Sequence, residues 1–203
     1  MPNILHKGDL PNDLDLGPLV AIDCETMGLN FIRDRLCLVQ LSNGNGVAHM
    51  VQIDVTQNSA PNLCKLLSNE KILKIFHFGR FDIAALLNAF GVLTRPVYCT
   101  KIASKLVRTY TDRHGLKNLL QELLDTDISK QQQSSDWGAD ALTDAQLEYA
   151  ASDVIYLHQL KDELDLRLQR EGRLDLAKSC FDFLPIRAKL DLSGWPETDI
   201  FAH

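Results

Sequence analysis

Short apolar runs separated by turn residues fill the first part of the chain, and they predict β-strands. Residues 19–24 form an apolar run that is too short for a helix and suits a buried strand. Residues 36–41 and 47–53 are two further candidates, and the Asn/Gly cluster at 42–46 between them is typical of a hairpin turn. We therefore expect three strands at the start of the fold, arranged antiparallel.

Helices and strands alternate in the next part of the chain. Apolar residues at helical spacing predict helices at residues 61–67, 80–90, 100–107 and 116–124. Short apolar runs predict strands at residues 72–76 and 97–99. Three antiparallel strands followed by this alternation predict an α/β fold, in which one mixed sheet is flanked by helices.

A long amphipathic helix is predicted after this region. Thr143 and Gln146 form a capping-box pair, which marks a helix start. Apolar residues then recur with helical spacing as far as Leu168, and Gly172 is the expected end. We expect one continuous helix here. The remainder should hold one further helix and a tail that includes Pro185.

Composition and the cysteine pattern narrow the class of protein. The chain has 203 residues, of which 45% are hydrophobic and 24% charged, as is typical of one globular domain. No apolar run reaches the ~20 residues needed to cross a bilayer, and the N-terminus has no signal pattern. The five cysteines are scattered without a CxxC pair, which favours free thiols over disulfides or a zinc site. We expect a cytoplasmic protein without membrane contact.

The net charge limits the kind of nucleic acid that the chain can bind. A formal charge of −6 argues against a broad basic face for long nucleic acid, because such binding depends on Lys and Arg at the phosphates. The charge is compatible with a small nucleotide substrate, since bound metal ions reverse the local charge of an acidic pocket. We therefore expect a short substrate that is held at the site itself.

Five residues in three separate segments are the candidates for chemistry. Asp23 and Glu25 follow the first apolar run, and residues i and i+2 of a strand share a face. Asp82 lies in the first turn of a predicted helix. Tyr149 and Asp153 are four residues apart on a predicted helix and share its face. Each segment alone has a simpler explanation. Asp23 and Glu25 are then solvated acids at a strand end, and Asp82 is an acid that favours the N-terminus of a helix. Tyr149 is then a tyrosine at the boundary of an amphipathic helix.

Taken together, these five residues suit a metal-dependent hydrolase. Hard cations such as Mg²⁺ and Mn²⁺ prefer carboxylate oxygens and water. Two such ions about 4 Å apart stabilise the attacking and the leaving oxygen of an in-line displacement, which requires acids from several elements. A tyrosine hydroxyl beside them can orient or deprotonate the attacking water through a hydrogen bond. The pattern therefore predicts two divalent cations, Mg²⁺ or Mn²⁺, and phosphodiester hydrolysis.

The order of these motifs resembles a known family. DxE, a second-segment Asp and YxxxD are similar to the DEDDy branch of the DnaQ-like 3′–5′ exonucleases. Residues 135–137 and 142–157 resemble ribonuclease D in particular. The resemblance implies a ribonuclease H-like fold and release of nucleoside 5′-monophosphates. It also implies that Asp23 bridges both metals, that Glu25 and Asp153 complete one site, that Asp82 helps to hold the other, and that Tyr149 positions the water.

A narrower resemblance concerns substrate length. Residues 24–29 and 33–37 are similar to the nanoRNase C group, whose short, acidic, single-domain members degrade very short RNAs down to dinucleotides. Because the sequence ends at His203, we expect it to lack the extra helical domains of ribonuclease D. The resemblance implies a homo-oligomer, a ring of eight subunits. Three alternatives stay open: trimming of structured RNA 3′ ends as by ribonuclease D, a DNA 3′–5′ exonuclease, and a catalytically inactive RNA-binding scaffold.

Three residues near the acidic motifs are candidate substrate contacts. Leu29 either wedges between two bases or anchors its loop to the core. Phe78 either stacks on a base or packs in the core. His77 either contacts a phosphate or is a buried histidine with its own partner.

A polar loop offers candidates for binding a terminal 5′ phosphate. Arg108, Arg113 and His114 precede a predicted helix, and they are either phosphate ligands or solvated loop charges. Lys130, beside Gln132, is a further candidate contact with the substrate.

The chain is divided into three parts on these grounds. Residues 1–18 are polar and turn-rich and are interpreted as an N-terminal arm or loop. Residues 19–170 are the expected exonuclease domain. Residues 171–203 form a helical extension with many large apolar side chains, which either packs back onto the domain or contacts another subunit. The family resemblance favours the subunit contact.

Overall fold

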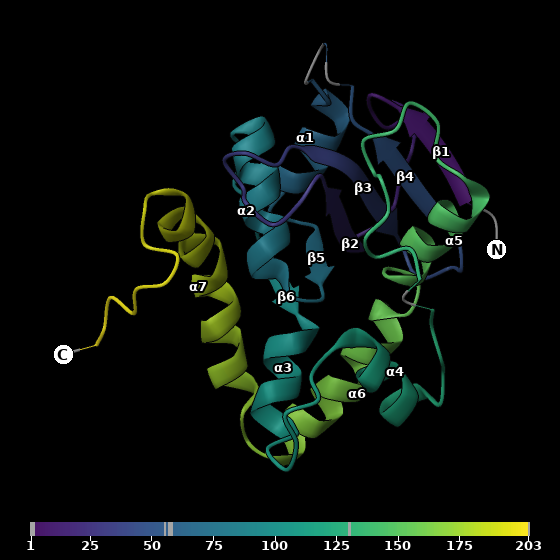
Figure 1. Ribbon diagram of the computed structural model, residues 1–203. Coiled ribbons are helices and arrows are strands. Elements are labelled where there is room, and N and C mark those ends of the chain that lie inside the picture. Colours follow the sequence, from purple (N-terminus) through teal and green to yellow (C-terminus); the bar gives the residue numbers. More distant parts are fainter. Residues whose placement is uncertain (1–2, 55, 57–58, 130, 203) are drawn as a thin grey trace.

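A single mixed sheet with helices around it makes up the computed structural model, which describes residues 3–54, 56, 59–129 and 131–202 (Figure 1). Lys130, a candidate substrate contact, lies outside the described residues. The strands are β1 (Asn3–Lys7), β2 (Leu19–Thr26), β3 (Leu36–Ser42), β4 (Ala48–Gln52), β5 (Leu73–Phe76) and β6 (Val97–Cys99). The helices are α1 (Pro61–Ser68), α2 (Gly79–Phe90), α3 (Thr100–Val107), α4 (Leu116–Leu124), α5 (Asp144–Ser152), α6 (Leu157–Arg170) and α7 (Leu174–Leu192).

The predicted fold class is confirmed. The six strands lie in the order β1-β4-β3-β2-β5-β6. β2, β3 and β4 are antiparallel neighbours, whereas β5 pairs parallel to β2 and β6 parallel to β5. β2 is thus central, with β3 on one side and β5 on the other. All residues of β3 are buried, as expected for a strand with both faces covered.

The N-terminal segment differs from its interpretation as an arm or loop. Residues 3–7 form β1, which pairs parallel with β4 along its whole length. After β1 the segment passes beside the start of α1. There the Asp9 carboxylate accepts hydrogen bonds from the backbone N–H groups of Asn62 (2.8 Å) and Leu63 (2.9 Å). These are N–H groups of the first helical turn, which lack partners within the helix. A side chain distant in sequence therefore caps α1.

The long helix predicted after Thr143 is divided in two, and the prediction of one continuous helix is wrong. The capping box is present: Thr143 Oγ1 accepts from Gln146 N (3.3 Å), and Gln146 Oε1 accepts from Thr143 N (2.9 Å). α5 ends at Ser152, whose hydroxyl donates to the Tyr149 carbonyl (2.6 Å). This side-chain bond competes with the backbone ladder. Apolar spacing continues across the break and does not reveal it.

The C-terminal extension is dominated by one helix. α7 packs along α2 and β6 and forms one flank of the molecule, with the C-terminus beyond it (Figure 1). Pro185, assigned to a tail by sequence, lies inside this helix. Phe181, Leu184 and Ala188 are buried on its inner face. Among the described helices none is both long and apolar enough to cross a membrane. The division of the chain at residues 18 and 170 stays a prediction.

Candidate active site

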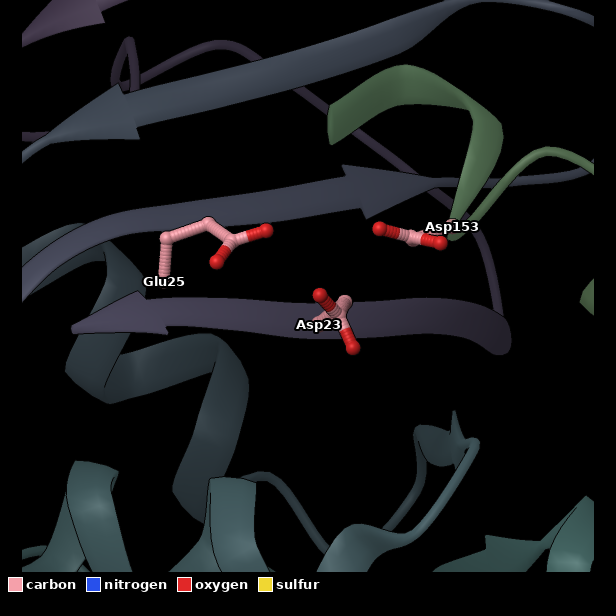
Figure 2. Close-up of side chains that lie close together, drawn as sticks. All are labelled: Asp23, Glu25 and Asp153. Atoms are coloured by element: carbon pink, nitrogen blue, oxygen red, sulfur yellow. The ribbon is translucent and has the colours of Figure 1, made fainter. Parts of the chain in front are cut away.

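Three carboxylates from two elements converge at the centre of the sheet. Asp23 and Glu25 extend from the same face of β2, and Asp153 approaches them from the end of α5 (Figure 2). One oxygen from each side chain lies within 4.8 Å of the others. The alternation of a strand explains the first two positions. Asp153 closes the group because α5 ends at this point, where its backbone is still in the right-handed helical region.

A buried glutamine from the neighbouring strand supports this group. Gln40 lies opposite Asp23 in the β2–β3 register and is completely buried. Its Nε2 donates to Glu25 Oε1 at 3.5 Å. Sequence reasoning missed this residue, although a polar side chain within the apolar run 36–41 was the available signal. The bond orients Glu25 toward the other acids.

Asp82 completes the set of four acids. It lies in the first turn of α2, is only 3% exposed and lines the same cleft as the other acids. Its carboxylate accepts bonds from its own backbone N–H and from the backbone N–H and thiol of Cys24. Cys24, which lies between Asp23 and Glu25 in β2, thus directs its thiol to this fourth acid. Among the described residues, the close group contains the other three acids and not Asp82.

Tyr149 stands beside Asp153 as the sequence spacing predicts. Its phenol hydrogen-bonds to the Asp153 carboxylate. Burial, together with the charge of Asp153, raises the pKa of Tyr149 well above its usual value. In this arrangement the phenol is a hydrogen-bond donor to the Asp153 carboxylate.

A tryptophan that sequence reasoning did not select holds Tyr149 in place. Trp137 is 3% exposed, and its ring lies 6.0 Å from the Tyr149 ring, centroid to centroid. Its loop is fixed from both sides: Gln146 Nε2 donates to the Asp136 carbonyl (3.0 Å), and Arg35 Nη2 donates to the Gly138 carbonyl (3.2 Å). The signal was present in the polar loop, where Trp137 is the one large aromatic residue.

The electrostatics of the acid group favour a bound cation. Burial raises the pKa of Asp23 and of Asp82 well above the usual range, and repulsion from the neighbouring acids adds to this. Burial and the charges of Asp153 and Asp82 raise the pKa of Glu25 to about 9. Several buried carboxylates without a counter-charge are costly. Hard oxygen donors from four side chains are what a small divalent cation binds, so the residues present fit such an ion.

The cleft around these acids has a volume of about 660 Å³ and also holds three predicted substrate contacts. Leu29 lines it with 84% of its surface exposed. His77 lines it too, and its Nδ1 lies 2.9 Å from Thr100 Oγ1. Phe78 lies under the ammonium of Lys101, which is 4.0 Å from the ring centroid. The structure thus brings these three side chains to the acids, and their contacts with a substrate stay predictions.

The predicted phosphate ligands are not brought to the cleft. Arg108 is 1% exposed, and its guanidinium pairs with Glu122 and donates to Ser104 Oγ (3.0 Å) and to the Arg113 carbonyl (2.8 Å). His114 Nδ1 lies 2.9 Å from the same Ser104 hydroxyl. None of the three predicted ligands is among the described residues that line the cleft. A phosphate-binding role for them stays a prediction.

Two lysines bring positive charge to the described lining of the cleft, and the ammonium of Lys117 also pairs with Asp127 (2.9 Å). Lys101 and Lys117 both line it. Sequence reasoning missed them because lysines at exposed helix positions are common, and only the folded arrangement shows which of them face the acids.

Comparisons with known proteins identify the family of the chain. The 3′–5′ exonuclease sequence model matches residues 9–169. The chain belongs to the 3′–5′ exonuclease family. The predicted resemblance and the ribonuclease H-like fold are thereby confirmed. Ribonuclease D from Acidiphilium cryptum is 37% identical over 158 residues, which are 78% of this chain. The chain spans only 40% of the length of that relative.

Solved structures of the exonuclease family match over the whole chain. Brucella melitensis NrnC with bound Mg²⁺ is 60% identical, covers 100% of both chains and has a TM-score of 0.96. Brucella melitensis NrnC bound to pGG is 61% identical, covers 100% of this chain and 99% of the other, and has a TM-score of 0.97. The family uses divalent metals, and the acid group of this chain is the place where the residues fit one.

Metal-free protein is expected to lose stability as the pH rises. The folded-state pKa of Glu25 is about 9 against a usual value of 4.5, so at neutral pH the folded state holds a proton that the unfolded chain has released. The free energy of unfolding then decreases as the pH rises between these two values. Glu25→Gln is expected to stabilise metal-free protein at about pH 8 by more than about 1 kcal/mol. It should also reduce the increase in melting temperature that Mg²⁺ causes.

Thermal unfolding in EDTA and in Mg²⁺, at about pH 5 and about pH 8, measures this effect. Glu148→Gln is the matched control, because it removes an exposed acid from the same helix as Tyr149. Equal behaviour of the two variants would contradict the assignment of Glu25 to a cation site.

Proposed function

We propose that the protein is a two-metal-ion 3′–5′ exoribonuclease that degrades short oligoribonucleotides, down to dinucleotides, to nucleoside 5′-monophosphates. The observation that supports it is the approach of Asp23, Glu25 and Asp153 to within 4.8 Å of one another, beside Asp82 and Tyr149. The similarity to NrnC, which binds Mg²⁺ in one solved structure and pGG in another, supports the short substrate.

The four acids together would bind two divalent cations, Mg²⁺ or Mn²⁺. Asp23 has the central position on β2 and is the proposed bridge. Glu25 and Asp153 would complete one cation site, and Asp82 would help to hold the second. When bound, two such ions stabilise the attacking and the leaving oxygens of an in-line displacement at phosphorus.

Tyr149 orients the attacking water through its hydroxyl, which the bond to Asp153 and the Trp137 ring hold in place. The water oxygen forms a bond to phosphorus, and the bond from phosphorus to the 3′ oxygen of the preceding nucleotide breaks. One proton of the water is lost to solvent, and the departing 3′ oxygen gains one. The products are a 5′-monophosphate and an oligonucleotide shorter by one residue.

Short substrates suit the charge and the size of the site. The cleft is about 660 Å³, and its described cations are Lys101 and Lys117 together with His77 when protonated. Long nucleic acid is bound by many cations in a row, and a chain with net charge −6 is poorly suited to that.

The ribonuclease D relatives support a second candidate, trimming of the 3′ ends of structured RNA.

The C-terminal helix is the proposed contact between subunits of a ring of eight, in the cytoplasm. Phe183, Ile186, Trp195 and Phe201 are exposed on α7 and the segment after it. Large apolar side chains gathered at a surface are typical of an interface. A ring would restrict access to each site and favour short substrates.

Mononucleotides are expected from a 5′-labelled diribonucleotide in Mg²⁺ or Mn²⁺, with rates that fall as the RNA is lengthened from two nucleotides. Asp23→Asn should lower the rate by a factor on the order of 10³, because several kcal/mol of metal-dependent stabilisation are lost. Persistence of the dinucleotide while structured RNA is trimmed would favour the ribonuclease D activity instead. DNA of equal length tests the preference for RNA.

Tyr149→Phe is expected to lower kcat by about 10²-fold to 10⁴-fold, because the substitution removes only the hydroxyl that positions water. Tyr156→Phe is the matched control, as it removes a hydroxyl from a tyrosine four residues beyond Ser152, outside the residues that line the cleft. Initial rates with the dinucleotide measure both. Similar rates for the two variants would exclude the proposed role of the phenol.

The mass of the protein in solution tests the ring. Light scattering is expected to give eight times the mass of one chain, which is 22.8 kDa. Ile186→Glu should shift this mass toward the single chain, because a charge on the α7 surface opposes apolar association. A monomer at assay concentration, already for the unchanged protein, would contradict the proposal.

A further inference from the structure

Among the four acids, Asp82 is the one that stands apart from the close group. Asp23 and Glu25 extend from β2, and Asp153 joins them within 4.8 Å. Asp82 lies in the first turn of α2 and lines the same cleft, but among the described residues it is not a member of that group. The place of α2 relative to β2 therefore decides how far Asp82 reaches toward the other acids.

The turn that leads into α2 is held tightly on the side of β5. Phe78, at the N-cap, has a φ of 68°, in the left-handed region that bulky residues rarely adopt. Gly79 lies so close to Phe76 that a Cβ atom at this glycine would come within 2.8 Å of the Phe76 Cβ. A residue keeps such a conformation only where its surroundings determine it. The turn that carries Asp82 is therefore fixed in position on this side.

A buried carboxylate near the end of α7 holds the same turn from another side. The Asp191 side chain is only 1% exposed. Arg80, two residues before Asp82, donates to it from Nε to Oδ2 (2.7 Å) and from Nη2 to Oδ1 (2.8 Å). Two parallel bonds of this kind fix both distance and orientation. α7 packs beside α2, and this ion pair joins the two helices where α2 begins (Figure 1).

The α7 end of this link is itself held in place. Arg187, one turn before Asp191, donates to the same carboxylate from Nε (3.1 Å) and from Nη2 (2.8 Å). The guanidinium of Arg187 also donates to the Trp195 carbonyl, and that of Arg80 to the Pro196 carbonyl. The Asp191 carboxylate therefore loses several hydrogen bonds at once if it turns away from Arg80.

We propose that Asp191 is a positioning residue for the second cation site. Through Arg80 it keeps the first turn of α2, and with it Asp82, at the distance from Asp23 that the second ion requires. This inference rests on the proposed two-metal function, in which Asp82 helps to hold that ion. It gives the C-terminal helix a part in the chemistry of its own subunit, in addition to the proposed contact between subunits.

The ion cluster is better suited to set geometry than to add stability. Buried ion pairs are costly to desolvate, and apolar residues in their place often leave stability unchanged or increase it. α7 already buries Phe181, Leu184 and Ala188 on its inner face. Mg²⁺, in contrast, demands near-ideal octahedral geometry from its ligands. A ligand such as Asp82, on a helix outside the sheet, therefore needs contacts that fix the position of that helix.

Binding of Mn²⁺ without turnover tests this inference. Calorimetric titration of the whole protein with Mn²⁺, in the presence of adenosine 5′-monophosphate as a product, counts the ions and gives the affinity of each. Asp191→Asn and Arg80→Lys remove the bidentate link to α2. Arg187→Lys is the matched variant within the cluster, because it changes a partner of Asp191 that lies on α7 itself. Glu70→Gln is the control for loss of an exposed acid, which pairs with Arg95 (2.9 Å).

The unchanged protein is expected to bind a pair of ions. Asp191→Asn and Arg80→Lys should each weaken one of them about tenfold and leave the other within about twofold, as is typical when a residue that orients a metal ligand is changed. Arg187→Lys and Glu70→Gln should leave both affinities within about twofold. With the dinucleotide, kcat of Asp191→Asn should fall in limiting Mg²⁺ and recover when Mg²⁺ is raised, because mass action fills a weakened site.

Equal weakening of both ions in every variant of the cluster would show that Asp191 serves only the fold. Unchanged affinities in Asp191→Asn and Arg80→Lys would remove the link to Asp82. If Asp191→Asn does not fold, the comparison of Arg80→Lys with Arg187→Lys decides. An unchanged protein that binds both ions but does not cleave the dinucleotide would contradict the proposed substrate and leave this inference intact. Binding of a single ion would contradict the two-metal function and this inference with it.

Discussion

Repulsion among four carboxylates that line one cleft is the constraint that governs this molecule. Asp23, Glu25, Asp82 and Asp153 would separate in water, and only a rigid frame keeps them near one another. That frame is the centre of the sheet, since β2 is flanked on both sides by other strands. Repulsion among the carboxylates destabilises the metal-free site. A bound cation removes this repulsion, and the site therefore has a higher affinity for cations.

Different neighbouring residues hold the acids in place. Gln40 orients Glu25 from the next strand, and the backbone of Cys24 holds Asp82. The capping box that starts α5 also fixes Gln146, which in turn holds the loop that carries Trp137. The capping box that starts α5 therefore also helps to place the Trp137 ring, which supports Tyr149.

Much of the fold and the core of the site could be predicted because they depend on local periodicity. α3, α4 and β6 begin and end at the predicted residues, and the i, i+2 and i, i+4 spacings placed the acids on shared faces. Non-local contacts could not be predicted. β1 depends on pairing with β4, and the burial of Arg108 depends on Glu122, fourteen residues away. The sequence does not distinguish Lys101 and Lys117 from other surface lysines, and only the fold shows that they line the cleft.

The parallel strand at the N-terminus has a consequence for behaviour at high concentration. Without β1, the β4 strand would present an unpaired row of backbone groups. With it, the described sheet ends in β1, a five-residue strand that carries Lys7, and in β6, a three-residue strand preceded by Pro96. Short, charged or proline-flanked edges are poor templates for intermolecular β-pairing. Resistance to amyloid-like aggregation is therefore built into both margins of the sheet.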